Sequence, residues 1–171
     1  SLLQRRCWLG KALNAELQTV IAWAGPQVDQ SWPDGVGARA MLALAWSWLS
    51  AAGDGSVRQQ AARAVDGGSM SLARSGLAAL QPWDCEQREH AAATFAKRWR
   101  QRPVILDAWF GMEASAPFGD GIARADALLQ DPAFDPNAPN SLRAVLGGFG
   151  RCAEHFHRTD GRGYEWMAQQ L

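Results

Sequence analysis

The chain has 171 residues and a formal net charge of zero, from 17 basic and 17 acidic side chains. This balance argues against a broad electrostatic surface for nucleic acid or anionic lipid, and a hydrophobic share of 47% excludes a disordered chain. No apolar run approaches the roughly 18 residues of a membrane span. Arg5, Arg6 and Lys11 interrupt the only early apolar stretch, so we expect no signal peptide.

The composition favours helices over strands. The sequence holds 31 Ala and 17 Leu against 7 Val, 3 Ile and 3 Thr. Ala and Leu are strong helix formers, whereas β-branched residues favour strands. Nine tryptophans are unusual for this length, and most should be buried or lie at interfaces because a large indole ring is costly to leave in water.

In the first half of the chain, apolar residues recur at helical spacing in four segments. A loop separates the first two segments over residues 28–37, with a turn at Pro33-Asp34-Gly35. The four segments are Leu9 to Ile21, ending at Gly25-Pro26; Met41 to Leu49, ending at Gly53; Ser56 to Val65; and Leu72 to Leu80, capped by Ser71 and ending before Pro82.

Five more helices are expected in the second half. Asp84 opens the first of them, with Gln87 completing a possible capping box, and Pro103 starts the next at a favourable first-turn position. The third of the five helices is expected from Asp120 to Gln130. The apolar faces of the other four, in chain order, are Ala92, Phe95, Ala96 and Trp99; Val104, Ile105, Ala108, Trp109 and Met112; Leu142, Val145, Leu146 and Phe149; and Tyr164, Trp166, Met167 and Leu171.

Eight or nine short helices with short connections and no strand alternation predict an all-α fold. We expect a right-handed α-solenoid, or superhelix, of paired antiparallel helices, with residues 1–171 as a single helical domain. The sequence has no strict internal period, so this prediction depends on helix lengths and order.

The sequence lacks the common catalytic signatures, including H-E-x-x-H, G-x-S-x-G and the phosphate-binding glycine patterns. Four potential zinc ligands, Cys152, Glu154, His155 and His157, lie within six residues. On a helix, positions 155 and 157 lie about 200° apart and do not face one metal. We therefore expect His155 and His157 to be ordinary side chains at a helix end and not metal ligands. The alternative, if the segment is extended, is a small metalloenzyme built around these two histidines.

The cysteine pattern indicates a reduced chain. Cys7, Cys85 and Cys152 are odd in number, far apart in sequence and outside any C-x-x-C pair. We expect small apolar thiols in or near the core and a cytoplasmic location.

Several segments together resemble bacterial aminopeptidase N, a zinc alanyl aminopeptidase family. The stretch from Asp107 to Pro117 resembles its D-K-W-F-x-x-Q-A-x-S-P segment, and the order and spacing of the matches agree over about residues 35 to 171. The other matching segments are Gly37 to Met41 (G-R-R-A-L), Ser69 to Ser71 (N-M-T), Ala138 to Arg143 (N-P-N-R-x-R) and Phe156 to Tyr164 (F-H-x-x-D-G-x-G-Y).

The resemblance implies the non-catalytic, armadillo- or HEAT-like C-terminal domain of such an enzyme. In that family, the zinc lies in a separate catalytic domain that uses H-E-x-x-H and G-A-M-E-N segments, which this chain lacks. The implied role is to pack on the catalytic domain of the same polypeptide and enclose the active-site chamber, which limits substrates to small peptides. No catalytic residue, metal ligand or cofactor is then expected here; the parent protein is the zinc-dependent enzyme. The alternative is a free-standing α-solenoid that binds proteins.

One site residue follows from the resemblance. Arg143 matches the second arginine of N-P-N-R-x-R, whereas Ser141 stands at the first. Arg143 is therefore a candidate substrate-channel cation that would meet a peptide carboxylate or backbone. The alternative is an arginine paired with a carboxylate between helices.

Three further expectations concern aromatic residues, a turn and length. Trp109 should be a core residue, and Phe110, off the Trp109 face, should contact the next repeat or another domain. Asp160-Gly161-x-Gly163 should form a tight turn.

Because the family continues beyond the position of Leu171, we expect a fragment of a larger chain whose last helix is partly exposed. Residues 1–34 of this chain match the family only weakly.

Overall fold

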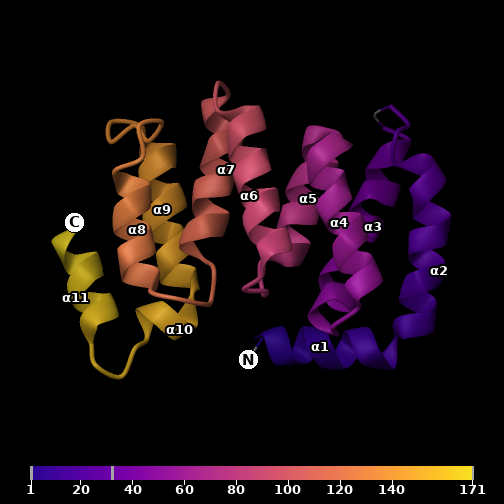
Figure 1. Ribbon diagram of the computed structural model, residues 1–171, viewed down its shortest axis with the longest axis horizontal. Helices are drawn as coiled ribbons and strands as arrows, with labels where there is room; N and C mark the ends of the chain where they lie inside the picture. Colours follow the sequence, from indigo (N-terminus) through magenta and orange to yellow (C-terminus); the bar gives the residue numbers. More distant parts are fainter. Residues whose placement is uncertain (1, 32, 171) are drawn as a thin grey trace. The chain divides into compact units, whose positions relative to one another are not determined.

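The computed structural model describes residues 2–31 and 33–170, and all the regular secondary structure in that part is helical. The helices are α1 (Leu2–Ala12), α2 (Asn14–Ala24), the 3₁₀ turn η1 (Gly25–Gln27), α3 (Gly35–Ala51), α4 (Gly55–Gly67), α5 (Met70–Leu80), α6 (Glu86–Trp99), α7 (Pro103–Ala114), α8 (Gly121–Leu129), α9 (Pro139–Arg151), α10 (Ala153–Phe156) and α11 (Arg162–Gln169) (Figure 1). The predicted all-α class is confirmed.

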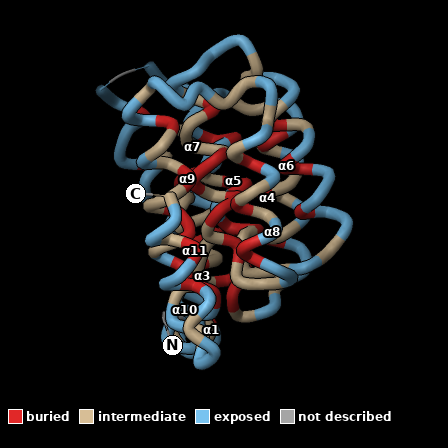
Figure 2. Tube along the Cα trace, turned by 90° about the vertical axis from the view of Figure 1, so that its left-hand side faces the viewer, coloured by how far each residue is buried: buried red, intermediate tan, exposed pale blue. Residues whose placement is uncertain are grey.

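The helices form two compact units, one up to Ala91 and the other from Ala92 onward, so that α6 contains the boundary. A single domain over residues 1–171 stays a prediction. Within each unit the buried residues lie largely on the helices and the connecting loops are exposed (Figure 2). None of the helices in the described part is long and apolar enough to cross a membrane.

In the first unit, α3 is the central helix. It packs against α1, α2, α4 and α5, and α4 in turn packs mainly on α5. Leu42 and Leu49 of α3, Val57 of α4 and Leu77 and Leu80 of α5 are buried. Burying aliphatic side chains on facing helices provides the stabilisation that short helices lack on their own.

In the second unit, α7 and α9 make the most extensive helix pair, and α8 packs on both. The buried residues of this core are Leu106, Phe110, Ala114, Ile122, Ala125, Leu128, Val145, Phe149 and Trp166. The indole of Trp166 donates a hydrogen bond from Nε1 to Asp126 Oδ1 at 2.7 Å, so the polar edge of this buried ring is satisfied.

The expected first helix is two helices. Leu13, between them, has φ −110° and ψ 27°, outside the helical range, and α1 runs crosswise to α2 (Figure 1). At Gly10, a Cβ atom would collide with the carbonyl oxygen of Trp48, so α1 crosses the backbone of α3 at close range. This close approach explains a break that the apolar spacing does not predict.

The predicted apolar face of α7 is wrong by one residue. Leu106, Phe110 and Ala114, spaced four apart, are buried, whereas Val104 is 80% exposed. Phe110 therefore lies in the core of its own unit, with its ring centroid 5.7 Å from that of Phe134. Its expected contact with the next repeat or another domain stays a prediction. Trp109 packs half-buried against the same core. The helix is apolar on two overlapping faces, and the spacing alone does not select one.

The expected exposure of the last helix holds for one of its aromatic residues. Tyr164 is 50% exposed, but Trp166 is only 5% exposed, since it stacks on Phe149 with ring centroids 4.5 Å apart. Met167 is half-buried. Leu171 lies outside the described residues.

Side chains cap several helices. Asp54 and Asp120 accept backbone N–H groups at the starts of α4 and α8. The helix expected from Asp120 to Gln130 is α8, but this cap is not predicted from the sequence. Ser69, not Ser71, caps α5, and α6 begins at Glu86, two residues after the expected start. Such caps satisfy N–H groups that the first turn of a helix leaves unpaired.

Replacing Asp54 with alanine is expected to lower the free energy of unfolding by about 1 kcal/mol near neutral pH. Burial alone would raise the pKa of Asp54, but hydrogen bonds from Ser56, Val57 and Gln18 outweigh it and lower that pKa. The cap therefore contributes fully above the ordinary pKa of an aspartate, and its contribution is lost as pH falls through the lowered pKa.

Urea unfolding at neutral and acidic pH measures this difference. Asp34→Ala is the matched control, because Asp34 precedes α3 but makes no capping hydrogen bond. Equal losses for the two variants at neutral pH would contradict the capping role of Asp54.

Candidate functional site

The first turns of α9 hold the candidate residue Arg143. Pro139 occupies the first turn, and the buried Ser141 donates a hydrogen bond from Oγ to Asp107 Oδ1 of α7 at 2.7 Å. Val145 is in the core and anchors the inner face of the helix. The serine that replaces the first arginine of the family pattern therefore ties α9 to α7 through a short hydrogen bond.

Arg143 itself is exposed on the outer side of this turn. Its one interaction within the described residues is a long hydrogen bond of 3.5 Å from Nη1 to Asn140 Oδ1. Most of its donors are therefore directed to solvent, and the guanidinium is available to an anionic partner. Whether it lines a substrate channel stays a proposal.

The two histidines among the four potential zinc ligands of residues 152–157 have different partners. His155 is buried on α10, and its Nε2 lies 3.1 Å from the carbonyl oxygen of Ala116. A carbonyl only accepts, so His155 donates from Nε2. His157 is exposed, with Nδ1 2.6 Å from the hydroxyl of Tyr164. Each ring is held by a separate protein group.

The thiol in this cluster is equally unsuited to metal binding. Cys152 is buried, and burial raises the pKa of its thiol, which disfavours the thiolate that a metal requires. Within the described part of the chain, no three His, Cys, Asp or Glu side chains come together as a metal site. All three cysteines are free thiols.

The turn before α11 agrees with the expectation. Gly161 has φ 78°, a left-handed conformation that glycine adopts readily. The side-chain hydrogen bond from Arg158 lowers the pKa of Asp160 to about 2. At Gly163, a Cβ would collide with the carbonyl oxygens of His155 and Phe156. Both glycines therefore have structural roles in seating α11 against α10.

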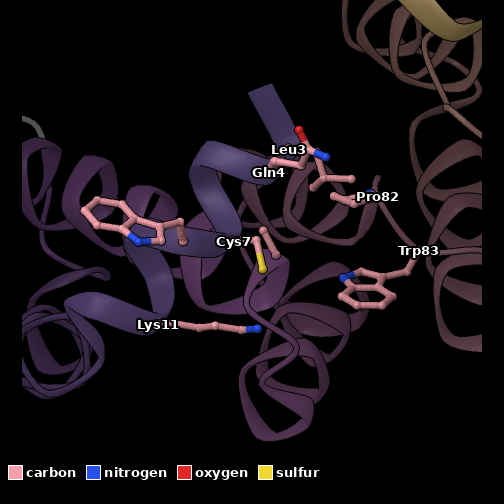
Figure 3. Close-up of a pocket in the computed structure, with 8 residues that line it drawn as sticks. Leu3, Gln4, Cys7, Lys11, Pro82 and Trp83 are labelled. Carbon is pink, nitrogen blue, oxygen red and sulfur yellow. The ribbon is translucent and has the colours of Figure 1, made fainter. Parts of the chain in front are cut away.

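A groove of about 410 Å³ that the sequence does not predict lies beside α1 in the first unit. Figure 3 shows Cys7 and Lys11 of α1 near Pro82 and Trp83 from the α5–α6 connection. The Trp83 indole donates from Nε1 to Ser50 Oγ at 3.1 Å, and the Arg58 guanidinium lies 4.3 Å from its ring centroid. No sequence signal marked this groove, because its walls come from segments about 75 residues apart.

These sites offer shape and charge for binding, and residues 2–31 and 33–170 hold no group of three His, Cys, Asp or Glu side chains that could bind a metal ion. The stacked helices define the class of the protein, which is a helical-repeat domain. The chain belongs to the family described as a domain of unknown function (DUF3458_C) with ARM repeats, whose model matches residues 3–171. ARM repeats are pairs or triplets of helices stacked side by side.

The curated relatives are bacterial enzymes. Aminopeptidase N of Caulobacter vibrioides is 38% identical over 85 residues, which cover 49% of this chain and 10% of that protein. Aminopeptidase N of Haemophilus influenzae is 31% identical over 88 residues, covering 49% and 10%. Aminopeptidase N of Escherichia coli is 28% identical over 104 residues, covering 60% and 12%. The chain thus spans about a tenth of the length of these relatives, and its resemblance to their C-terminal helical domain is confirmed.

A solved structure shares the fold. Aminopeptidase A of Legionella pneumophila, in complex with aspartic acid, matches 98% of this chain and 21% of its own with a TM-score of 0.83 and 21% identity. At this identity the likeness shows the fold alone, which is the α-solenoid expected from the sequence.

Proposed function

We propose that this chain is the non-catalytic C-terminal domain of a zinc metallo-aminopeptidase that removes N-terminal residues from small peptides. The observation that carries the proposal is the match of the chain to about a tenth of three bacterial aminopeptidases N. In this role the helices pack on the catalytic domain of the same polypeptide and enclose its active-site chamber. An enclosure of this kind excludes large chains and water by shape.

The residues of this chain do not fit a catalytic zinc. His155 is committed to the carbonyl of Ala116, His157 contacts the hydroxyl of Tyr164, and burial raises the pKa of the Cys152 thiol. The zinc of the proposed enzyme therefore belongs to another part of the parent polypeptide. The three free thiols support a reducing, cytoplasmic location for that parent.

Arg143 is proposed as a cation on the chamber wall. Its exposure and its single long hydrogen bond to Asn140 leave its donors for a peptide carboxylate or backbone carbonyl. An arginine engaged in a tight ion pair would not offer them.

The proposal is tested first on the chain by itself. The purified 171-residue chain is expected to hydrolyse no aminoacyl-anilide substrate, with or without added zinc, because it lacks a metal site in its described part. Zinc-dependent turnover that survives removal of contaminating peptidases would place the active centre in this chain and refute a non-catalytic role.

A further inference from the structure

A second groove, of about 420 Å³, lies between α3 and α5 near the starts of both helices. Its polar lining consists of Arg39, Arg74 and the hydroxyls of Ser71 and Ser75, and no acidic side chain lines it. Val36 and Met70, both substantially exposed, also line it. The volume falls in the range typical of sites for small ligands.

The two guanidinium groups of this groove differ in their availability. Arg39 donates from Nη1 to the carbonyl oxygens of Val28 and Gln30, at 2.8 and 2.9 Å. These bonds hold Arg39 against the preceding loop, where a Cβ on Gly35 would collide with its Nη1. Arg39 therefore supplies a positive charge that is fixed through Nη1, whereas its Nε–H and Nη2–H donors remain available.

The Arg74 side chain is exposed and makes no hydrogen bond, ion pair or ring contact with any other described residue. The hydroxyls of Ser71 and Ser75, on the same face of α5, likewise lack a partner in the described part of the chain. A guanidinium presents a planar fork of N–H donors that matches a carboxylate, and neighbouring hydroxyls add further donors. The unpaired donors thus line the same groove as a second cation, Arg39.

Arg39, Arg74 and Arg143 share a position in their helices. Each is the fifth residue of its helix, in α3, α5 and α9 respectively.

We propose that the groove between α3 and α5 binds the C-terminal carboxylate of a short peptide, with Arg74 as its principal ligand. The carboxylate accepts from Arg74 and the serine hydroxyls, and the last side chain of the peptide lies over Val36 and Met70. The exposed apolar side chains of Val36 and Met70 in the lining favour an organic body over free phosphate. The choice of a peptide rests on the proposed function, whereas the preference for an oxyanion rests on the groove alone.

The test is a titration of the full chain followed by the backbone amide signals of Ser71 and Ser75. The probes are N-acetyl-alanyl-leucine, its C-terminal amide and inorganic phosphate. We expect saturable binding of the acid, at least about tenfold weaker binding of the amide, and a similar loss for the acid with Arg74→Gln, because charge-assisted hydrogen bonds are the strong ones. Arg74→Lys should retain part of the affinity, since it keeps the charge but not the fork.

Arg63→Gln is the matched control, because Arg63 is an exposed arginine on α4 that does not line the groove. Equal binding of acid and amide, equal losses for Arg74→Gln and Arg63→Gln in variants with unchanged circular dichroism, or phosphate binding as tight as that of the peptide acid would each overturn the proposal. No outcome depends on peptidase activity, so failure here is distinct from failure of the domain's proposed role.

Discussion

Replacing Phe149 with alanine is expected to lower the free energy of unfolding by about 3–5 kcal/mol. Phe149 is fully buried on α9, with its ring centroid 4.5 Å from that of Trp166 and 6.2 Å from that of Phe156. The truncation removes these ring contacts and leaves a cavity that helices α9, α10 and α11 border. Denaturant unfolding followed by tryptophan fluorescence measures the loss.

Val104→Ala is the control for this prediction. Both residues belong to apolar faces predicted from the sequence, but the Val104 side chain is 80% exposed. Its truncation should change stability by less than about 0.5 kcal/mol. A loss at Val104 comparable to that at Phe149 would mean that the sequence-predicted face of α7 is the buried one after all.

Gly148→Ala is expected to destabilise the protein by about 1–3 kcal/mol, against the usual preference of helices for alanine. A Cβ at this position would lie 2.7 Å from the carbonyl oxygen of Gly111 and 2.8 Å from the Cβ of Ala114. Both atoms belong to α7, so α9 would have to move away from its main packing partner. The midpoint of thermal or urea unfolding reports the effect.

The adjacent glycine provides the matched control. A Cβ at Gly147 meets only the ends of flexible side chains, 3.4 Å from Arg151 Nη1 and 3.9 Å from Arg143 Cγ. Gly147→Ala should therefore be neutral or stabilising by about 0.5–1 kcal/mol, since alanine loses less conformational freedom in a helix. Destabilisation of the same size at both positions would contradict the close approach of α7 and α9 at Gly148.

Local signals in the sequence predict much of this fold. Asp120 opens a helix because its carboxylate accepts two backbone N–H groups, and Gly161 forms a turn because its φ is positive. Long-range packing decides what those signals miss. The break at Leu13 follows the crossing of α1 over α3 at Gly10, a contact between residues 38 apart that no local pattern encodes.

The candidate sites also differ in whether local sequence signals predict them. The match to the family motif predicts Arg143 as a substrate-channel residue, and the structure adds only that its side chain is exposed. The groove that contains Arg74 was not predicted, because Arg39 and Ser71 come from separate helices and neither belongs to a chemical motif. The two-residue spacing of His155 and His157 predicts that they face different directions on a helix, and the structure shows each ring with its own partner, although His157 lies just beyond the end of α10.

The proposed role is tested most directly on the complete polypeptide whose reading frame contains this chain. The measurement is the rate at which that purified polypeptide, loaded with zinc, releases the N-terminal residue from a tripeptide and from a folded protein with the same N-terminal sequence. We expect rapid release from the tripeptide and little from the folded protein, because an enclosed chamber admits only small chains. No release from either substrate, or equal release from both, would contradict the assignment of this chain as the enclosing domain of an aminopeptidase.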